Sequence, residues 1–135
     1  MATTTATITM SSADLTGDAL ALTTVSTLTK AGTATGMSET SGVGRKTTSA
    51  TAQYTLFDGN DYAATGSHKV YLKNTSSTSS EFFTLTINAE EVGRLYAGDW
   101  AFLPWGAHDA DNDIKITPSV STSMTLEYML IYQAA

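Results

Sequence analysis

The chain contains no cysteine, so it has no disulfide framework, no zinc–thiolate site and no thiol nucleophile. Charge is also scarce, with 7 Lys and Arg against 13 Asp and Glu and a net charge of −6. Without a basic cluster, binding to nucleic-acid phosphates is disfavoured. No apolar run approaches the length that crosses a bilayer, and the N-terminus lacks the basic and apolar regions of a signal peptide. We therefore expect neither nucleic acid nor a membrane as partner.

Aromatic residues are missing from the first part of the chain, where none precedes Tyr54. Hydroxyl residues take their place, because the 135 residues include 25 Thr and 14 Ser. Threonine is β-branched and suits a pleated surface, and apolar residues recur at every second position between the threonines. This alternation indicates short β-strands. A chain of this length can bury a core without disulfides or metal.

The first 50 residues carry weak structural signals. Residues 19–28 could form a helix, but their many threonines favour a strand. Residues 31–48 include four glycines and little to bury, which predicts a long loop or extended arm ordered by contact with a partner. We expect residues 1–50 to form an extended N-terminal arm with the first strands, and residues 51–135 to form the body of the same fold.

Strand signals are clearer from residue 52 onward. A hairpin is expected between residues 70–73 and 83–87, and a second one between 91–96 and 100–104. Pro104 should end its strand or lie at a sheet edge. Residues 124–133 are apolar on both faces, so this strand is either central in a sheet or covered by a neighbouring subunit. Seven or eight strands at this spacing are typical of a β-sandwich or barrel.

An acidic loop offers a possible metal site. Asp109, Asp111 and Asp113 have the alternate spacing of calcium ligands. A calcium loop of the EF-hand type needs Gly at its sixth position and Glu at its twelfth, where this chain has Ile114 and Val120. The pattern therefore favours a solvated acidic turn, with calcium as the weaker alternative, and no metal or cofactor is expected.

Signals for catalysis are weak. His68 and His108 are expected on the surface without metal or base partners, and no Gly-x-Ser-x-Gly elbow is present. Residues 42–48 resemble a phosphate-binding loop, but no lysine follows the final glycine. We expect no enzymatic activity, and we expect Arg45 and Lys46 to fix the flexible segment to an acidic partner surface.

The densest aromatic cluster consists of Tyr96, Trp100, Phe102 and Trp105. Core packing is the favoured interpretation, because aromatic side chains dominate burial in small domains. A platform for carbohydrate or for another subunit is the alternative. The residues expected at an interface are Arg45, Lys46, Met129 and Ile131.

Several segments resemble small structural proteins of tailed bacteriophages, especially marine and cyanobacterial phages. They lie in both halves of the chain: 12–18 (SADLTGD), 27–32 (TLTKAG), 69–76 (KVYLKNTS), 92–105 (VGRLYAGDWAFLPW), 113–119 (DIKITPS) and 126–131 (LEYMLI). The likeness concerns turns and strand residues, and no family active site comes with it.

The resemblance implies an all-β fold, an antiparallel, jelly-roll-like β-sandwich with an extended N-terminal arm. It implies a capsid decoration (cement) protein on the capsid surface of the virion, with the major capsid protein as partner and a homo-oligomer, expected to be a trimer. Such a protein binds across junctions of capsid subunits and stabilises the shell. A tail, head-fibre or knob component that meets the host surface is the alternative.

Overall fold

The computed structural model describes residues 3–15 and 17–134. All regular secondary structure in this part of the chain consists of β-strands and two short 3-10 helices, and every strand pairing is antiparallel. The expected all-β class is confirmed, and the sheets are consistent with a β-sandwich. The described residues contain no helix that is long and apolar enough to cross a membrane. The chain divides into two compact units, Met1–Ser38 and Glu39–Ala135.

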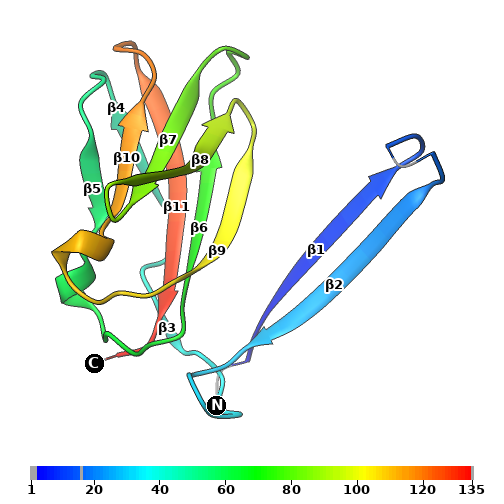
Figure 1. The fold of residues 1–135 in the computed structure, drawn as a ribbon, viewed down its shortest axis with the longest axis vertical. Coiled ribbons are helices and arrows are strands. Elements are labelled where there is room, and N and C mark those ends of the chain that lie inside the picture. Colours follow the sequence, from blue (N-terminus) through cyan, green and yellow to red (C-terminus); the bar gives the residue numbers. More distant parts are fainter. Residues whose placement is uncertain (1–2, 16, 135) are drawn as a thin grey trace. The chain divides into compact units, whose positions relative to one another are not determined.

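The first unit is a long β-hairpin. Strands β1 (Thr4–Ser12) and β2 (Leu20–Leu28) pair in one continuous register from Thr4 opposite Leu28 to Ser12 opposite Leu20 (Figure 1). After β2, the chain turns at Lys30, where the carbonyl of Lys30 accepts a hydrogen bond from the amide of Thr33, 3.1 Å away. The strand expected over residues 19–28 is thus confirmed.

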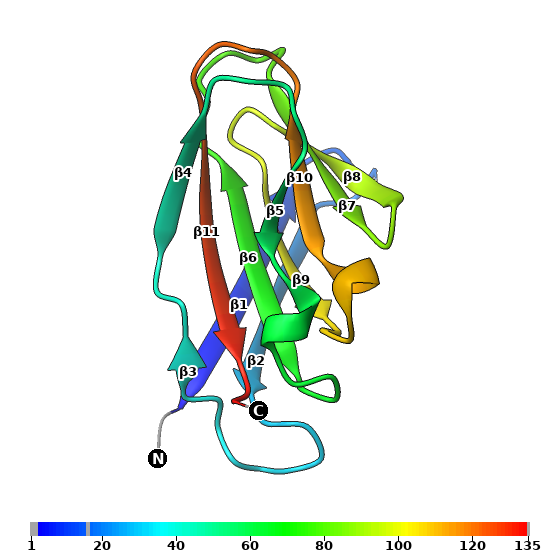
Figure 2. The ribbon, with the colours of Figure 1, turned by 90° about the vertical axis from the view of Figure 1, so that its left-hand side faces the viewer.

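The second unit contains two sheets, whose layers Figure 2 shows side by side. One sheet has the order β5 (Tyr54–Phe57), β10 (Ile114–Pro118), β7 (Phe82–Ile87), β8 (Glu90–Tyr96). The other has the order β11 (Met124–Tyr132), β6 (His68–Asn74), β9 (Trp100–Trp105), and β3 (Glu39–Thr40) and β4 (Gly44–Thr48) both pair with β11. The short helices η1 (Gly59–Asp61) and η2 (Ala110–Asn112) lie in loops that precede β6 and β10.

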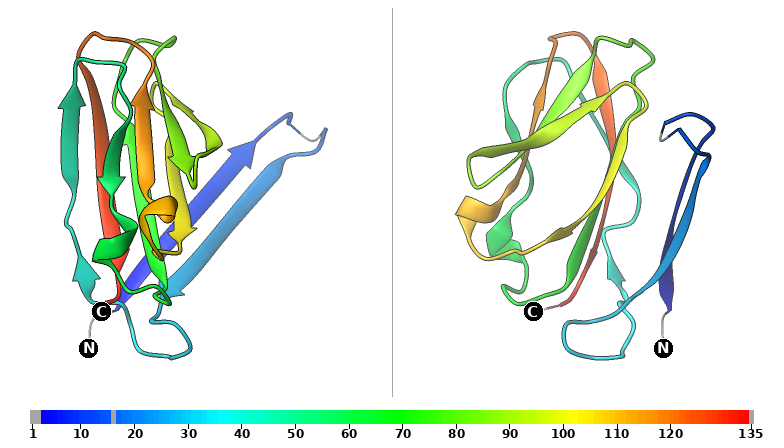
Figure 3. Two further views of the ribbon diagram at one scale, coloured as in Figure 1. Left: turned by 60° about the vertical axis from the view of Figure 1, so that its left-hand side comes forward. Right: turned by 45° about the vertical axis from the view of Figure 1, so that its right-hand side comes forward.

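The pairings of the second unit are nested. The last strand, β11, pairs with β4, and β10 pairs with β5. Moving inward along the chain, β9 pairs with β6, and β8 pairs with β7. Strands β4 to β11 therefore run as one long double-stranded ribbon whose successive pairs alternate between the two sheets, as the two views of Figure 3 allow the reader to follow.

The core lies between these two sheets and follows strict alternation. In β6 and β10 every second residue is buried, which places one side of each strand against the opposite sheet. Trp105 joins this core, where its ring contacts Phe57 and Tyr62. The buried core residues are Phe57, Val70, Leu72, Phe83, Leu85, Leu95, Trp105, Ala107, Ile114, Ile116, Met124, Leu126 and Leu130.

Both expected hairpins are wrong, although their strands are present. Strands β6 and β7 belong to different sheets, and so do β8 and β9. Residues 97–99 connect the two sheets, and they are fixed to the end of β6 because Gly98 donates to the carbonyl of Asn74 and Asn74 donates to that of Asp99. The only hairpin between consecutive described strands of this unit joins β7 to β8. Its turn uses Asn88 and Ala89, both with positive φ.

Residues 39–48 are also more regular than expected. They form β3 and β4 along one edge of β11, so the loop expected over residues 31–48 is wrong for this part. Position 44 requires a glycine for steric reasons, because a Cβ there would lie 2.7 Å from Cζ of Tyr128. Because β3 and β4 pair with one side of β11 and β6 with the other, β11 is a central strand. This is one of the two alternatives predicted from its apolar residues, the other being a strand covered by a neighbouring subunit. Pro104 lies on edge strand β9, as predicted.

Candidate functional site

The outward face of the β4–β11–β6–β9 sheet combines aromatic and charged side chains. The register places Trp100 opposite Lys73 and Phe102 opposite Tyr71, with Tyr71 also opposite Met129 on β11. Tyr71, Phe102 and Met129 are half-buried, whereas Trp100 is 51% exposed. This strip, defined as Tyr71, Trp100, Phe102 and Met129, is called the outer aromatic strip.

The aromatic cluster expected from the sequence is thereby divided. Trp105 fills the core, in line with the favoured interpretation. Tyr96 packs against Phe82 with ring centroids 5.0 Å apart, and the guanidinium of Arg94 lies over the Phe82 ring. Trp100 and Phe102 face outward with Tyr71, which fits the alternative of a contact platform.

A polar network borders the outer aromatic strip. The carboxylate of Glu127 accepts a hydrogen bond from Tyr71 Oη at 3.1 Å and forms an ion pair with Arg45 at 3.0 Å. These contacts lower the pKa of Glu127, with the hydrogen bond from Arg45 as the largest cause and the bond from Tyr71 next. The pKa of Tyr71 is raised, mainly by burial and then by its hydrogen bond to Glu127. The network fixes the Tyr71 ring at the centre of the sheet face.

The expected interface residues lie on different surfaces. Arg45 is on the outward face with Glu127, whereas Lys46 lies 4.3 Å from the ring centroid of Tyr54 on β5. Both cations therefore have partners within the chain. Met129 is half-buried on the outward face, and Ile131 is buried. The structure does not gather these four residues into one patch.

Tyr54, the partner of Lys46, has a buried hydroxyl that lacks a hydrogen-bond partner among the described residues. Burial raises its pKa, and the nearby Tyr128 raises it further. The ammonium of Lys46 lies over the Tyr54 ring and forms a cation–π contact that joins β4 to β5.

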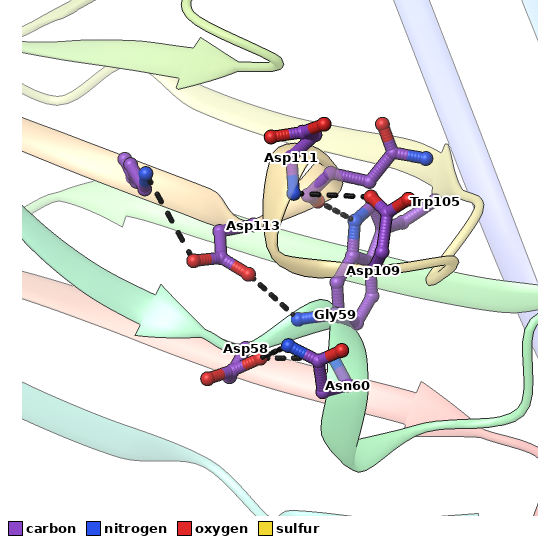
Figure 4. A network of polar contacts seen from close by, with 9 residues as sticks. Asp58, Gly59, Asn60, Trp105, Asp109, Asp111 and Asp113 are labelled. Atoms are coloured by element: carbon purple, nitrogen blue, oxygen red, sulfur yellow. Dashed lines mark hydrogen bonds and ion pairs between the residues drawn. The ribbon is translucent and has the colours of Figure 1, made fainter.

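The structure does not bring the three carboxylates of the acidic loop together (Figure 4). Asp109 caps η2 by accepting the amide of Asp111, 3.0 Å away. Asp113 is buried, and its Oδ1 accepts the amide of Gly59 at 2.8 Å. Asp111 is exposed. Within residues 3–15 and 17–134, no group of three or more His, Cys, Asp or Glu could hold a metal ion.

The acidic loop instead packs its short helix η2 against η1. Gly59 passes so close to η2 that a Cβ there would lie 2.1 Å from the carbonyl oxygen of Asp109. Trp105 Nε1 donates to the carbonyl of Asn112 at 2.7 Å. Asp58 caps η1 in the same manner as Asp109 caps η2. The carboxylates of this region thus stabilise turns and a loop junction.

The two histidines differ in environment. His68 is fully buried, contrary to the surface position expected, because Nε2 bonds the carbonyl of Ala63 at 2.8 Å and Nδ1 accepts the amide of Gln133 at 3.2 Å. Both ring nitrogens are therefore occupied by the backbone. His108 is exposed, 3.7 Å from a carboxylate oxygen of Asp109. Residues 42–48, compared above with a phosphate loop, include edge strand β4.

A shallow depression, which no sequence prediction included, lies at one end of the second unit. Its volume is about 560 Å³, and hydroxyl side chains dominate its lining: Thr75, Ser76, Ser77, Thr78, Glu81, Thr122, Ser123, Met124 and Thr125. Glu81 accepts hydrogen bonds from Ser76 and, at 3.4 Å, from Thr122. The only signal for it in the sequence is that two Ser/Thr clusters, 75–80 and 121–125, precede β7 and overlap the start of β11.

The β1–β2 hairpin has two unlike faces, which no sequence prediction included either. Alternation and register give one face Ile8, Met10, Leu20 and Leu22 together with Thr24 and Ser26, and the other face mostly hydroxyl side chains together with the exposed Val25. Met10 and Leu22, which are directly opposite each other, are 47% and 42% exposed. The first of these two surfaces is called the apolar hairpin face.

Comparison with known proteins gives no relative from which a role could be transferred. No family model, no curated protein and no solved structure matches this chain.

Proposed function

We propose that this chain is a non-enzymatic structural protein of a tailed-bacteriophage virion, a decoration (cement) protein that binds across junctions of the major capsid protein. The observation that carries the proposal is the first unit. It is a two-stranded hairpin, which is marginally stable in water by itself, and it leaves large apolar side chains exposed. An element of this kind gains its stability from a contact with another surface.

The second unit supplies a rigid body for such a contact, and we propose that it is a jelly roll. A jelly roll consists of eight strands in two packed sheets, and it recurs in viral capsid and lectin domains. The nested pairs β4 with β11, β5 with β10, β6 with β9 and β7 with β8 are those of a double-stranded ribbon rolled into two sheets. This order supports the jelly-roll proposal and agrees with a virion role.

A second candidate is a tail, head-fibre or knob component that meets the host surface. The observation in its favour is the outer aromatic strip, because Trp100 is half exposed beside Phe102 and Tyr71. Exposed aromatic rings on a sheet suit contacts with saccharide or with another protein.

The number of copies per virion separates these functions. Quantitative gel densitometry or mass spectrometry of purified particles should give a decoration protein in numbers comparable with the major capsid protein. A small fixed number per particle would instead support the tail or fibre candidate. Absence from purified particles would refute both.

A further inference from the structure

The β1–β2 hairpin lacks the features by which exposed strands avoid pairing with other chains. Its two strands contain no charged residue and no proline, and the register between them has no bulge. Natural proteins protect open strands with lysine, proline, bulges or short length, whereas these strands have nine residues each. The hairpin is therefore built for contact with another surface.

The position of charge in the first unit identifies the kind of surface. Its charged side chains are three in number: Asp14 and Asp18 in the turn between the strands, and Lys30 after the end of β2. The hairpin thus has two acidic residues at its tip, no charge along its strands and one basic residue at its other end. Two such hairpins placed antiparallel bring each acidic tip to the base of the other, whereas a parallel arrangement gathers four carboxylates.

The charge of the second unit also favours the hairpin as the place where two copies meet. The second unit contains eleven of the 13 acidic residues and six of the seven basic ones, and this excess of negative charge opposes contact between two bodies. The hairpin strands carry no such penalty. A second copy of this chain therefore finds its most favourable contact on the hairpin.

We propose that two copies of the chain pair through the apolar hairpin face, antiparallel, with Ile8, Met10, Leu20 and Leu22 of one hairpin packed on those of the other. The opposite face, rich in hydroxyls and carrying the exposed Val25, remains outward in this arrangement, where it can meet the capsid surface of the proposed function. The pairing is a property of the hairpin and goes beyond the proposed virion role. It gives a dimer, in contrast with the trimer that the phage resemblance implies.

The size of the face sets the strength of this contact. A nine-residue strand is about 30 Å long, and two strands about 4.8 Å apart offer a face of roughly 300 Å². The pair then buries roughly 600 Å², about half of the roughly 1,200 Å² at the lower end of stable interfaces. We expect a dissociation constant of about 10–100 µM, which copies held close together on an assembly would exceed in effective concentration.

Sedimentation velocity of the full chain from about 2 to 300 µM tests the proposal over the expected range. The wild-type chain should move from monomer to dimer. Leu22→Lys, on the apolar hairpin face, should raise the dissociation constant at least about tenfold. Thr23→Lys is the matched control, since it adds the same charge to the next residue on the opposite face. It should change the constant less than about threefold.

Because Leu22→Lys could also open the hairpin, both variants are compared with the strands locked. Ser11 and Ala21 are directly opposite each other on the hydroxyl face, and the chain has no other cysteine, so Ser11→Cys with Ala21→Cys gives one defined disulfide. The difference between Leu22→Lys and Thr23→Lys should persist in this background. Equal weakening by both variants would overturn the assignment to the apolar hairpin face.

Charge reversal tests the antiparallel arrangement. Lys30→Glu alone should weaken the dimer by about threefold or more, and adding Asp14→Lys and Asp18→Lys should restore it. No rescue would refute the antiparallel pairing. A wild-type chain that stays monomeric to about 300 µM, or a trimer that Leu22→Lys leaves intact, would refute pairing through the hairpin altogether.

Discussion

Replacing Asn74 by alanine should destabilise the second unit by about 2–5 kcal/mol. Asn74 is fully buried at the end of β6, and its side chain forms three hydrogen bonds. Its amide donates to the carbonyls of Leu95 at 2.9 Å and Glu81 at 3.2 Å, and its Oδ1 accepts the amide of Ser76 at 2.9 Å. One residue thus connects the loop that lines the hydroxyl depression to strands of both sheets.

The magnitude follows from which partners water can reach. The bond to Leu95 is buried, so water does not replace the lost donor, at a cost of about 1–3 kcal/mol. The partners on Glu81 and Ser76 are only partly buried, so water replaces part of each bond and each loss costs about 0.5–1 kcal/mol. For a unit of about 100 residues, the total lowers Tm by roughly 10–25 °C.

Tryptophan fluorescence during urea or thermal unfolding measures this change without interference from the hairpin. Both tryptophans and all other aromatic residues belong to the second unit, and Trp105 lies in its core. Asn74→Asp separates loss of the donor from loss of volume, because it keeps the shape but directs a carboxylate oxygen at two carbonyls. A change below about 1 kcal/mol for Asn74→Ala, or a stable Asn74→Asp protein, would refute this reasoning.

Two further perturbations test the loop junction and the polar network. Gly59→Ala should destabilise the fold by about 2 kcal/mol or more, because the new Cβ would lie 2.1 Å from a backbone oxygen. Gly93→Ala is the control, since no atom lies within 4 Å of its Cβ, and it should change stability by less than about 1 kcal/mol in the same unfolding assay. Equal effects of the two variants would contradict the steric argument. Folding lowers the pKa of Glu127 from its ordinary value of 4.5. The ionised carboxylate therefore stabilises the fold at pH values above 4.5, and this contribution is lost as the pH falls below 4.5 through the lowered pKa. The difference in unfolding midpoint between wild type and Glu127→Gln should therefore narrow from about pH 5 to pH 3, and a constant difference would count against the network.

The strands of the second unit could be predicted because their core residues alternate, as in Val70, Leu72 and Asn74 of β6. Their pairing could not. Alternation reports which face a strand buries, and it contains no information on which strand lies beside it. The connection at residues 97–99 has the composition of a hairpin turn, yet its amides and carbonyls bond to Asn74 of another strand. The true hairpin turn, Asn88–Ala89, lacks the glycine by which such turns are usually found.

The polar candidates failed for a related reason. Asp113 and Asp109 have the spacing of calcium ligands, but a short 3-10 turn between them directs one carboxylate to Gly59 and the other to the amide of Asp111. His68 was expected at the surface because it begins a strand, and it is buried by backbone partners more than 60 residues apart in sequence, Ala63 and Gln133. Spacing predicts a shared side of the chain only where the secondary structure between the residues is known.

The hydroxyl content of the chain has two structural meanings. In the second unit many hydroxyls are occupied, for example Thr47 with Thr125 at 2.7 Å and Thr75 with the carbonyl of Thr125 at 2.8 Å. In the hairpin they are only partly sorted. Thr5, Thr7 and Thr9 share one face with Val25, whereas Ile8, Met10, Leu20 and Leu22 share the other with Thr24 and Ser26. A flexible tail would have no need of such sorting, because side chains acquire faces only when the strands are paired. The regular register over nine residue pairs therefore favours a contact element with one specific binding face.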